Sequence, residues 1–178
     1  MADKTKIIVR RAERFDLIAL ELLLSKGIEE SKGLLPPYDW GHVYHAAVNQ
    51  LQAGLIFVAS EAEKIIGCLS LDAQKWTWNP AFTVLRSVHF YVLPEERAKT
   101  LPDGKTLVFQ GLLQAGQWLA DQASSEEYAC PLIVEQLHSL GPDNRAAAKD
   151  ELMTRAGFAY AGGNFVYLGQ PPKAEAAE

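Results

Sequence analysis

The stretch "VLPEERAKTLPDGKTL", residues 92–107, lies between an apolar run and a second apolar segment with helical periodicity. In the second segment Val108, Leu112, Ala115 and Leu119 recur at spacings of four, three and four, which predicts a helix with one buried stripe. The preceding run, RSVHFYVL, has the β-branched and aromatic composition of a strand. Because the first N–H groups of a helix have no intrahelical partner, the loop between these elements is a place where an anion can bind.

A further strand is expected after this helix, at residues 129–137 (ACPLIVEQL). The order strand, helix, strand predicts a parallel, right-handed crossover. Gly111 and Gly116 weaken the helix by about 1 kcal/mol each relative to alanine, so we expect close packing around them. The loop then lies at the carboxyl edge of a strand, where open α/β sheets bind ligands.

The segments before the loop predict a strand, two helices and a meander. Residues 6–10 (KIIVR) are typical of a first strand, and Asp16 is placed to cap a following helix. After GLLPPYD, the spacing of Tyr44, Val48 and Leu51 predicts a second helix that ends near Gly54. LIFVAS and IIGCLSL, separated by the charged EAEK, predict an antiparallel pair that RSVHFYVL extends to three strands.

The C-terminal segments predict a short helix and a hairpin. Gly141, Pro142 and Asp143 introduce the helix, which Gly157 is placed to terminate. In FAYAGGNFVYL, aromatic residues alternate around Gly162 and Gly163, a pattern typical of a tight hairpin turn.

Bulk composition bounds the class of protein. The chain has 178 residues, 48% of them hydrophobic and 22% charged, with no internal repeat, so we expect one domain at 1–169 and a disordered tail at 170–178. The formal net charge of −5 argues against a nucleic-acid binder. No apolar segment has the length of a signal peptide or membrane span, so a cytoplasmic protein is expected. Cys68 and Cys130 lack metal-ligand spacing and are expected to be buried thiols, with no metal bound.

The order of elements resembles that of the GNAT acetyltransferase superfamily across residues 6–169. Two local markers accompany it: Val92-Leu93-Pro94 before the loop matches the V-x-P of that family, and Gly157-Phe158 matches its helix-ending GF. The resemblance implies an α+β (mixed α/β) fold with a central, mixed and mostly antiparallel sheet flanked by helices. It also implies acetyl-CoA as co-substrate and an amine as acceptor, with no nucleic acid or membrane as partner.

The resemblance implies that the loop holds the pyrophosphate of CoA while the pantetheine lies between two strands that splay apart. The loop departs from the family's R-G-x-G pattern, since Ala98 and Thr100 stand where glycines are usual and LPDG follows. On this resemblance the expected cofactor-binding residues are Phe90, Val92, Arg97, Ala98, Lys99, Gly104, Lys105, Thr106 and Asn144.

A P-loop is a competing interpretation, because Gly104-Lys105-Thr106 resembles the end of G-x-x-x-x-G-K-[ST]. Lys99 occupies the place of the first glycine, and Pro102 lies inside the cradle. These two residues and the element order disfavour a P-loop NTPase.

Acyl transfer to an amine needs an oxyanion site, a base and an acid. The resemblance assigns the oxyanion site to backbone N–H groups near residues 90–92. Candidate bases are Glu135, ranked first because a carboxylate can act through water, and His89 and His138, each equally readable as packing or surface residues. Met153 stands at the usual place of the family's tyrosine acid, so Tyr91, Tyr160 or Tyr167 would have to substitute.

Three tryptophans, Trp40, Trp76 and Trp78, are candidates to line an acceptor pocket, although they could equally cover the edge of the core. The function expected from these features is N-acetyl transfer by direct attack of the amine. The alternative is an inactive GNAT-fold protein that serves as an acyl-CoA-binding or structural subunit. A homo-oligomer is compatible with either function.

Overall fold

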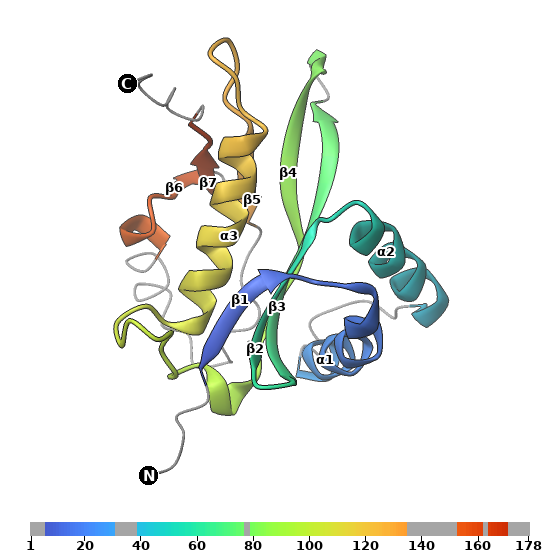
Figure 1. Cartoon of the computed structure of the whole chain (residues 1–178). Helices are drawn as coiled ribbons and strands as arrows, with labels where there is room; N and C mark the ends of the chain where they lie inside the picture. Colours follow the sequence, from blue (N-terminus) through green and yellow to red (C-terminus); the bar gives the residue numbers. More distant parts are fainter. Residues whose placement is uncertain (1–5, 31–38, 77–78, 135–152, 162–163, 171–178) are drawn as a thin grey trace, which may run out of the picture.

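The computed structural model describes residues 6–30, 39–76, 79–134, 153–161 and 164–170 (Figure 1). Within these residues the strands form one seven-stranded sheet in the order β1-β2-β3-β4-β5-β7-β6. The strands are β1 (Ile7–Arg11), β2 (Ile56–Glu61), β3 (Lys64–Trp76), β4 (Asn79–Val92), β5 (Pro131–Val134), β6 (Ala159–Ala161) and β7 (Asn164–Leu168).

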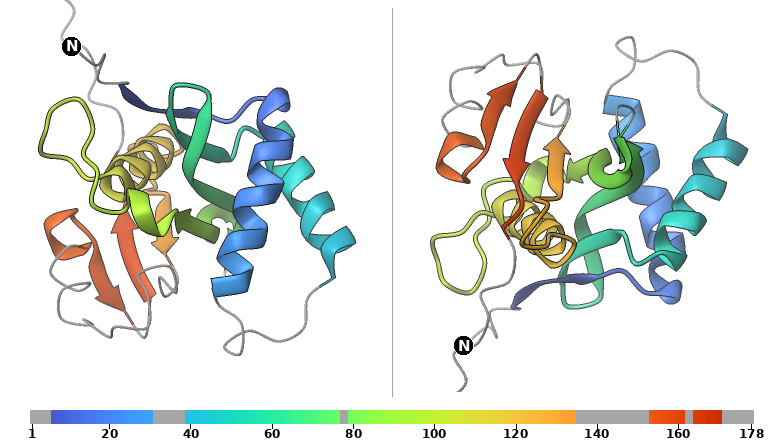
Figure 2. Two further views of the ribbon diagram at one scale, coloured as in Figure 1. Left: turned by 90° about the horizontal axis from the view of Figure 1, so that it is seen from below. Right: turned by 90° about the horizontal axis from the view of Figure 1, so that it is seen from above.

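Helices cover both faces of this sheet. α3 packs across β1 to β5 on one face, and α1 and α2 pack on β3 and β4 from the other. Figure 2 shows the strands between α3 on one side and the α1–α2 pair on the other. The helices are α1 (Leu17–Glu30), α2 (Trp40–Gln52) and α3 (Val108–Gln122), with short 3₁₀ turns η1 (Arg14–Asp16) and η2 (Pro94–Glu96). None of the described helices is long and apolar enough to cross a membrane.

The pairing confirms the expected mixed sheet. β4 and β5 are parallel, and every other neighbouring pair is antiparallel. The crossover through α3 is therefore the βαβ unit expected from the sequence. β2 and most of β3 are continuously buried because both faces of these strands meet helices.

The glycines of α3 allow the close packing expected of them. A Cβ atom at Gly111 would lie 2.7 Å from Cδ1 of Leu101, and one at Gly116 would lie 2.9 Å from Cδ2 of Leu69. The buried stripe runs through Val108, Leu112, Leu113, Gly116 and Ala120, whereas Ala115 and Leu119 are only partly buried. The stripe is thus rotated slightly from the one expected, because the glycines and not their neighbours face the sheet.

Two local expectations differ from the structure. The carboxylate of Asp16 lies at the end of η1 and binds Arg10 at 2.6 and 2.9 Å and the N–H of Glu13, so it does not cap α1. The strands expected at IIGCLSL and RSVHFYVL are also longer than expected, since β3 continues to Trp76 and β4 begins at Asn79, which makes a long hairpin. The ladder pairs Lys75 with Thr83 well beyond the expected strand ends.

Other local expectations are confirmed. Gly54 and Gly157 both have positive φ, at 69° and 84°, where α2 and the last helical turn end. β6 and β7 form the expected C-terminal hairpin, and the thiols of Cys68 and Cys130 are buried. The helix expected after Gly141 and the end of the strand expected to reach residue 137 lie outside the described residues.

Leu112→Ala tests the packing of α3. The side chain of Leu112 is fully buried between the helix and the sheet, so its truncation should lower the free energy of unfolding by about 3 kcal/mol. Gln114→Ala, at an exposed position two residues along the same helix, should change it by less than about 0.5 kcal/mol. Urea denaturation measures both, and equal effects would contradict this packing.

Candidate functional site

β4 and β5 pair over a very short distance. Their parallel ladder joins Leu85 to Leu132 and Arg86 to Ile133, and from Ser87 onward β4 pairs with no described residue of β5. β4 nevertheless continues to Val92 in its ladder with β3. The C-terminal half of β4 therefore has one edge that faces away from β3 and pairs with no residue of Pro131–Val134, the described part of β5.

Hydrogen bonds to β3 show which groups of β4 face that edge. The N–H of Leu93 donates to the carbonyl of Ile66 at 2.9 Å, which makes Gly67 and Val92 a non-hydrogen-bonded pair of the antiparallel ladder. Such pairs alternate along a strand, so Phe90 and Val92 both direct their N–H groups away from β3. Two backbone donors thus point from one strand toward the side where β5 has separated.

A bulge in β4 lies just before these donors. Ser70 of β3 is opposite His89, whereas the next residue, Leu71, is opposite Ser87, so Val88 is an extra residue on β4. A bulge bends the strand and increases its local twist. This bend occurs where β4 leaves β5, two residues before Phe90.

The loop after β4 is closed on itself by a short bridge. Thr100 and Leu107 pair, the N–H of Leu101 donates to the carbonyl of Thr106 at 2.7 Å, and the N–H of Val108 donates to that of Lys99 at 3.1 Å. Residues 101–106 therefore form a small lobe, and the chain enters α3 from a point beside Lys99. The extra LPDG of the sequence lies in this lobe.

The N–H groups inside the lobe already have acceptors. The carboxylate of Asp103 accepts from the N–H groups of Lys105 and Thr106, both at 2.9 Å, and the N–H of Gly104 donates to Leu101. The hydroxyl of Thr106 also donates to this carboxylate. These hydrogen bonds lower the pKa of Asp103, and the one from the hydroxyl has the largest effect. An anion at this lobe would have to displace a carboxylate of the same chain.

Arg97 is held against α1. Its guanidinium lies 2.7 Å from the carboxylate of Glu30, its Nε donates to the carbonyl of Val92 at 3.0 Å, and it stacks on the ring of Tyr91. The Tyr91 hydroxyl also donates to Glu30 at 2.9 Å. Glu30 thus binds both side chains at the start of the loop.

Lys99 belongs to a second ionic network. Its ammonium lies 2.7 Å from the carboxylates of both Glu61 and Glu96, and Glu96 also contacts Lys64 at 3.2 Å. The ion pairs with Lys99 and Lys64 lower the pKa of the buried Glu96, and those with Glu61 and Glu96 raise the pKa of Lys99. Of the loop cations, Lys105 alone makes no ion pair within the described part of the chain.

Solved structures similar to this chain share one fold. PaiA N-acetyltransferase from Thermoplasma acidophilum in complex with coenzyme A superposes with a TM-score of 0.57 at 15% identity, over 93% of this chain and 99% of that one. Arabidopsis thaliana Naa50 in complex with the bisubstrate analogue CoA-Ac-MVNAL gives 0.56 at 14% identity, over 90% and 96%. A possible acetyltransferase from Clostridium difficile 630 gives 0.59 at 17%, over 88% and 95%. The chain has the GNAT fold.

Sequence comparison alone does not detect this relationship: no protein-family model matches the chain, and no curated protein matches it in sequence. β4 and β5 are the two strands that were expected to splay apart, and among the described residues their ladder is limited to two pairs. The loop expected to bind pyrophosphate follows β4 directly. Phe90, Val92, Arg97, Ala98, Lys99, Gly104, Lys105 and Thr106 all lie on β4 or on this loop.

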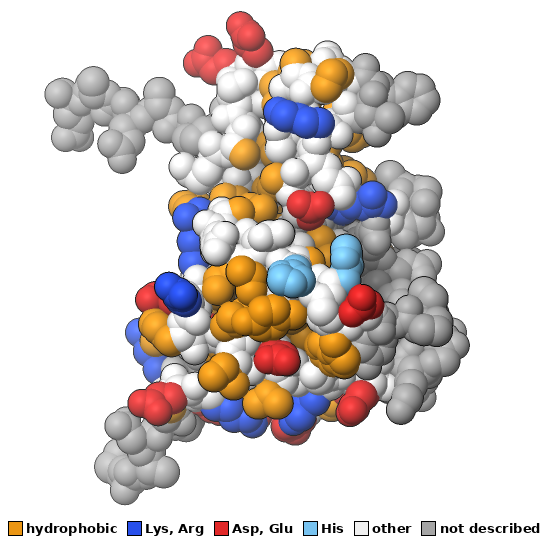
Figure 3. Space-filling model, turned by 90° about the vertical axis from the view of Figure 1, so that its right-hand side faces the viewer, with side chains coloured by type: hydrophobic (Ala, Val, Ile, Leu, Met, Phe, Trp, Pro, Cys, Tyr) orange, Lys and Arg blue, Asp and Glu red, His pale blue; other side chains and the backbone are white. Residues whose placement is uncertain are grey.

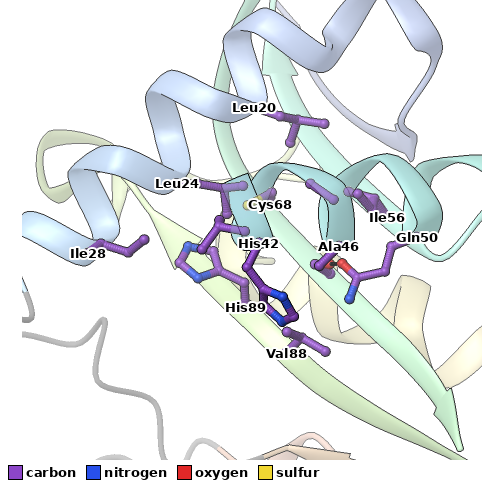
Figure 4. Close-up of a pocket in the computed structure, with 13 residues that line it drawn as sticks. Leu20, Leu24, Ile28, His42, Ala46, Gln50, Ile56, Cys68, Val88 and His89 are labelled. Atoms are coloured by element: carbon purple, nitrogen blue, oxygen red, sulfur yellow. Dashed lines mark hydrogen bonds between the residues drawn. The ribbon is translucent and has the colours of Figure 1, made fainter. Parts of the chain in front are cut away.

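A cavity of about 230 Å³ lies on the opposite face, between α1, α2 and the sheet. Figure 4 shows His89 from β4 and His42 from α2 reaching toward it, with Leu24 and Ile28 of α1 on another side. Gln50 accepts a hydrogen bond from the hydroxyl of Ser70 at its wall. No sequence signal pointed to this cavity, because its lining comes from five elements and consists mainly of ordinary apolar residues.

His89 is the one predicted catalytic side chain that lines this cavity. Its Nε2 atom is buried against Gly27 of α1 without a hydrogen-bond partner, and burial lowers its pKa to about 4. Cys68 lines the same cavity, and burial raises the pKa of its thiol to about 12. At neutral pH both groups are uncharged.

The tyrosines considered as acids have hydroxyls engaged with carboxylates. Tyr91 donates to Glu30, and Tyr167 of β7 donates to Asp121 of α3 at 3.0 Å. Burial, and then the adjacent carboxylate, raises the pKa of each phenol and so weakens it as a proton donor. Met153 is fully buried in the core.

The tryptophans do not line a common pocket among the described residues. Trp40 lies at the start of α2, and Trp76 lies at the end of β3 beside Lys75, Arg86 and Ile133. Figure 3 shows hydrophobic side chains beside histidines on the side of the molecule where α1 and α2 lie. The remaining predicted site residues, Glu135, His138, Asn144 and Trp78, lie outside the described residues. Within the described part of the chain no group of His, Cys, Asp and Glu side chains could hold a metal ion.

The depressed pKa of His89 predicts a pH dependence of stability. An unfolded histidine titrates at 6.5 and the folded one at about 4, so between these values the unfolded chain binds more protons. Lowering the pH from 6.5 to 4 should therefore destabilise the wild-type protein, relative to His89→Phe, by on the order of 3 kcal/mol. Denaturant titrations across this range measure the difference. Parallel pH profiles for the two proteins would contradict the buried, neutral imidazole.

Proposed function

We propose that the protein is an acyl-CoA-dependent N-acyltransferase that transfers an acetyl group from acetyl-CoA to an amine. The observation that carries the proposal is the pair of N–H groups of Phe90 and Val92, which face the side where β4 and β5 separate. Preorganised backbone donors of this kind stabilise the oxyanion of acyl transfer. Two structures with the same fold are complexes with coenzyme A or with a bisubstrate analogue that contains CoA, which supports acyl-CoA as the ligand.

The reaction follows from these groups. The lone pair of a neutral amine attacks the thioester carbonyl carbon, and negative charge develops on the carbonyl oxygen beside the N–H of Phe90 or Val92. Collapse of this intermediate breaks the C–S bond and forms the amide. The amine nitrogen loses one proton, and the departing CoA thiolate gains one.

The proton acceptor is proposed among Glu135, His138 and His89. His89 lies closest in sequence to the donors, but a pKa of about 4 makes it a weak base for an ammonium ion. We therefore assign His89 to positioning, and retain Glu135, acting through water, as first candidate for the base. The same reasoning leaves Tyr160 as the first candidate for the acid, because raised pKa values weaken Tyr91 and Tyr167.

The loop is proposed to hold the CoA pyrophosphate with Arg97, Ala98, Lys99, Gly104, Lys105 and Thr106, and Asn144 is proposed to contribute from the last helix. A specific observation favours a second function, that of a non-catalytic acyl-CoA-binding or interaction subunit. The guanidinium of Arg97 and the ammonium of Lys99 are each 2.7 Å from carboxylates of the same chain. A pyrophosphate would have to compete with these carboxylates.

Turnover separates the two functions. The purified protein should release free CoA from acetyl-CoA in the presence of primary amines, detected with a thiol reagent, and mass spectrometry should find the acetylated amine. Binding of acetyl-CoA without acetylation of any amine in a broad panel would favour the non-catalytic subunit.

Glu30→Gln tests the competition for Arg97. Removal of this carboxylate frees the guanidinium for phosphate, so calorimetry should find acetyl-CoA bound about tenfold more tightly. Glu29→Gln removes the same charge from the adjacent exposed position of α1 and should have a smaller effect, because salt screens distant charges. Equal effects of the two variants would contradict a direct contest between Glu30 and the ligand.

A further inference from the structure

We propose that the cavity beneath α1 and α2 binds an uncharged apolar group of the amine acceptor, about the size of a phenyl ring. This inference rests on the proposed transferase function and names the class of its acceptor. The cavity is formed by α1 and α2 over β2, β3 and β4, and its volume is about 230 Å³. Its lining residues are Leu20, Leu24, Ile28, His42, Val43, Ala46, Ala47, Gln50, Ile56, Cys68, Ser70, Val88 and His89.

The lining decides which part of an acceptor can enter. Among the described residues this lining contains no Asp, Glu, Lys or Arg, and at neutral pH the imidazole of His89 and the thiol of Cys68 are uncharged. An ammonium ion inside would therefore lose its hydration without gaining a counter-charge, which is strongly unfavourable. An apolar group gives up no hydrogen bonds to water when it enters, so the cavity selects the uncharged part of the acceptor.

The volume sets the size of that group. An apolar protein cavity of about 150 Å³ binds benzene, so about 230 Å³ accommodates a phenyl ring with a short substituent. Gln50 and Ser70 hydrogen-bond each other at the wall, and His42 is exposed beside them. These polar groups suit a ring that carries a hydroxyl or amide better than a plain acyl chain.

The position of the cavity connects it to the reacting atoms. Val88 and His89 line it, and the next residue along β4 is Phe90, whose N–H faces the edge vacated by β5. Consecutive residues of β4 thus line the cavity and present that N–H, so a short linker can join a ring in the cavity to a nitrogen on the side of the N–H. Burial near apolar walls also favours the neutral, nucleophilic form of the amine. The acceptor class is therefore an arylalkylamine or an amine with a comparable hydrophobic group.

Filling the cavity tests the proposal. Ala46 of α2 lines it, and Ala46→Phe places a ring in the space, whereas Asn49→Phe adds the same ring at an exposed position of the same helix. Release of CoA from acetyl-CoA is measured with 2-phenylethylamine and with ethylamine. Ala46→Phe should lower kcat/KM for 2-phenylethylamine at least about tenfold and leave that for ethylamine unchanged. Asn49→Phe should alter neither by more than about twofold.

Two results with the amines would overturn the proposal. One is an equal loss for both amines, or no loss, in Ala46→Phe. The other is a selective loss of turnover with butyryl-CoA relative to acetyl-CoA when ethylamine is the acceptor, since this would make the acyl chain the occupant of the cavity.

A binding measurement keeps this inference separate from the proposed function. The uncharged alcohol 2-phenylethanol should shift the imidazole NMR signals of His89 in the wild-type protein and in Asn49→Phe, but not in Ala46→Phe. If no amine is acetylated but these shifts occur, the transferase function fails while the apolar site stands. Absence of shifts in the folded wild-type protein up to the solubility of the alcohol would overturn the site itself.

Discussion

The separation of β4 from β5 is the constraint on which the rest of this structure depends. Two paired positions, Leu85 with Leu132 and Arg86 with Ile133, join the strands, and α3 packs on both halves of the sheet. A backbone N–H that leaves a ladder must find another partner, because an unpaired buried donor is costly. The N–H groups of Phe90 and Val92 point away from β3, and on the proposed function the thioester carbonyl oxygen is their acceptor.

In the loop after β4, carboxylates of the same chain bind the groups that the proposed pyrophosphate would also contact. Glu30, Glu61, Glu96 and Asp103 hold the groups that a pyrophosphate would use. The partly exposed ion pairs with Glu30 and Glu61 contribute about 0–1 kcal/mol each, whereas a pyrophosphate brings several charges to one place. On the proposed function, these ion pairs lower the affinity of the loop for an anion, but an anion can still displace them. In the lobe at residues 101–106 the carboxylate of Asp103 likewise accepts from N–H groups that an anion would need.

The sequence predicts those features that local patterns determine. The periodicity around Leu112, the strand composition of RSVHFYVL and the crossover they imply are properties of neighbouring residues, and the structure confirms them. The close packing at Gly111 and Gly116 was likewise expected, since glycine in a helix needs a compensating contact. Asp16 was assigned wrongly because its carboxylate binds Arg10 on the preceding strand, a tertiary contact that overrides a capping pattern.

The candidate site was predicted less completely, for a physical reason. Glu30 and Glu61, which bind Arg97 and Lys99, are 67 and 38 residues away in sequence, and no local pattern reports such distant pairing. The cavity under α1 and α2 exists because two helices and three strands fail to fill the space between them, which depends on packing and not on any motif. The position of β4, by contrast, could be predicted, because the V-x-P marker lies at the end of this strand.

The most direct test of this account is a titration of the ¹⁵N-labelled protein with acetyl-CoA, followed by NMR at the backbone amides of Phe90 and Val92. The account predicts saturable shifts at these two amides and at the loop residues 97–106, because the thioester carbonyl and the pyrophosphate occupy the two neighbouring places. Saturable binding that leaves Phe90 and Val92 unperturbed, or no binding at all, would contradict the central claim that this edge of β4 receives the acyl group.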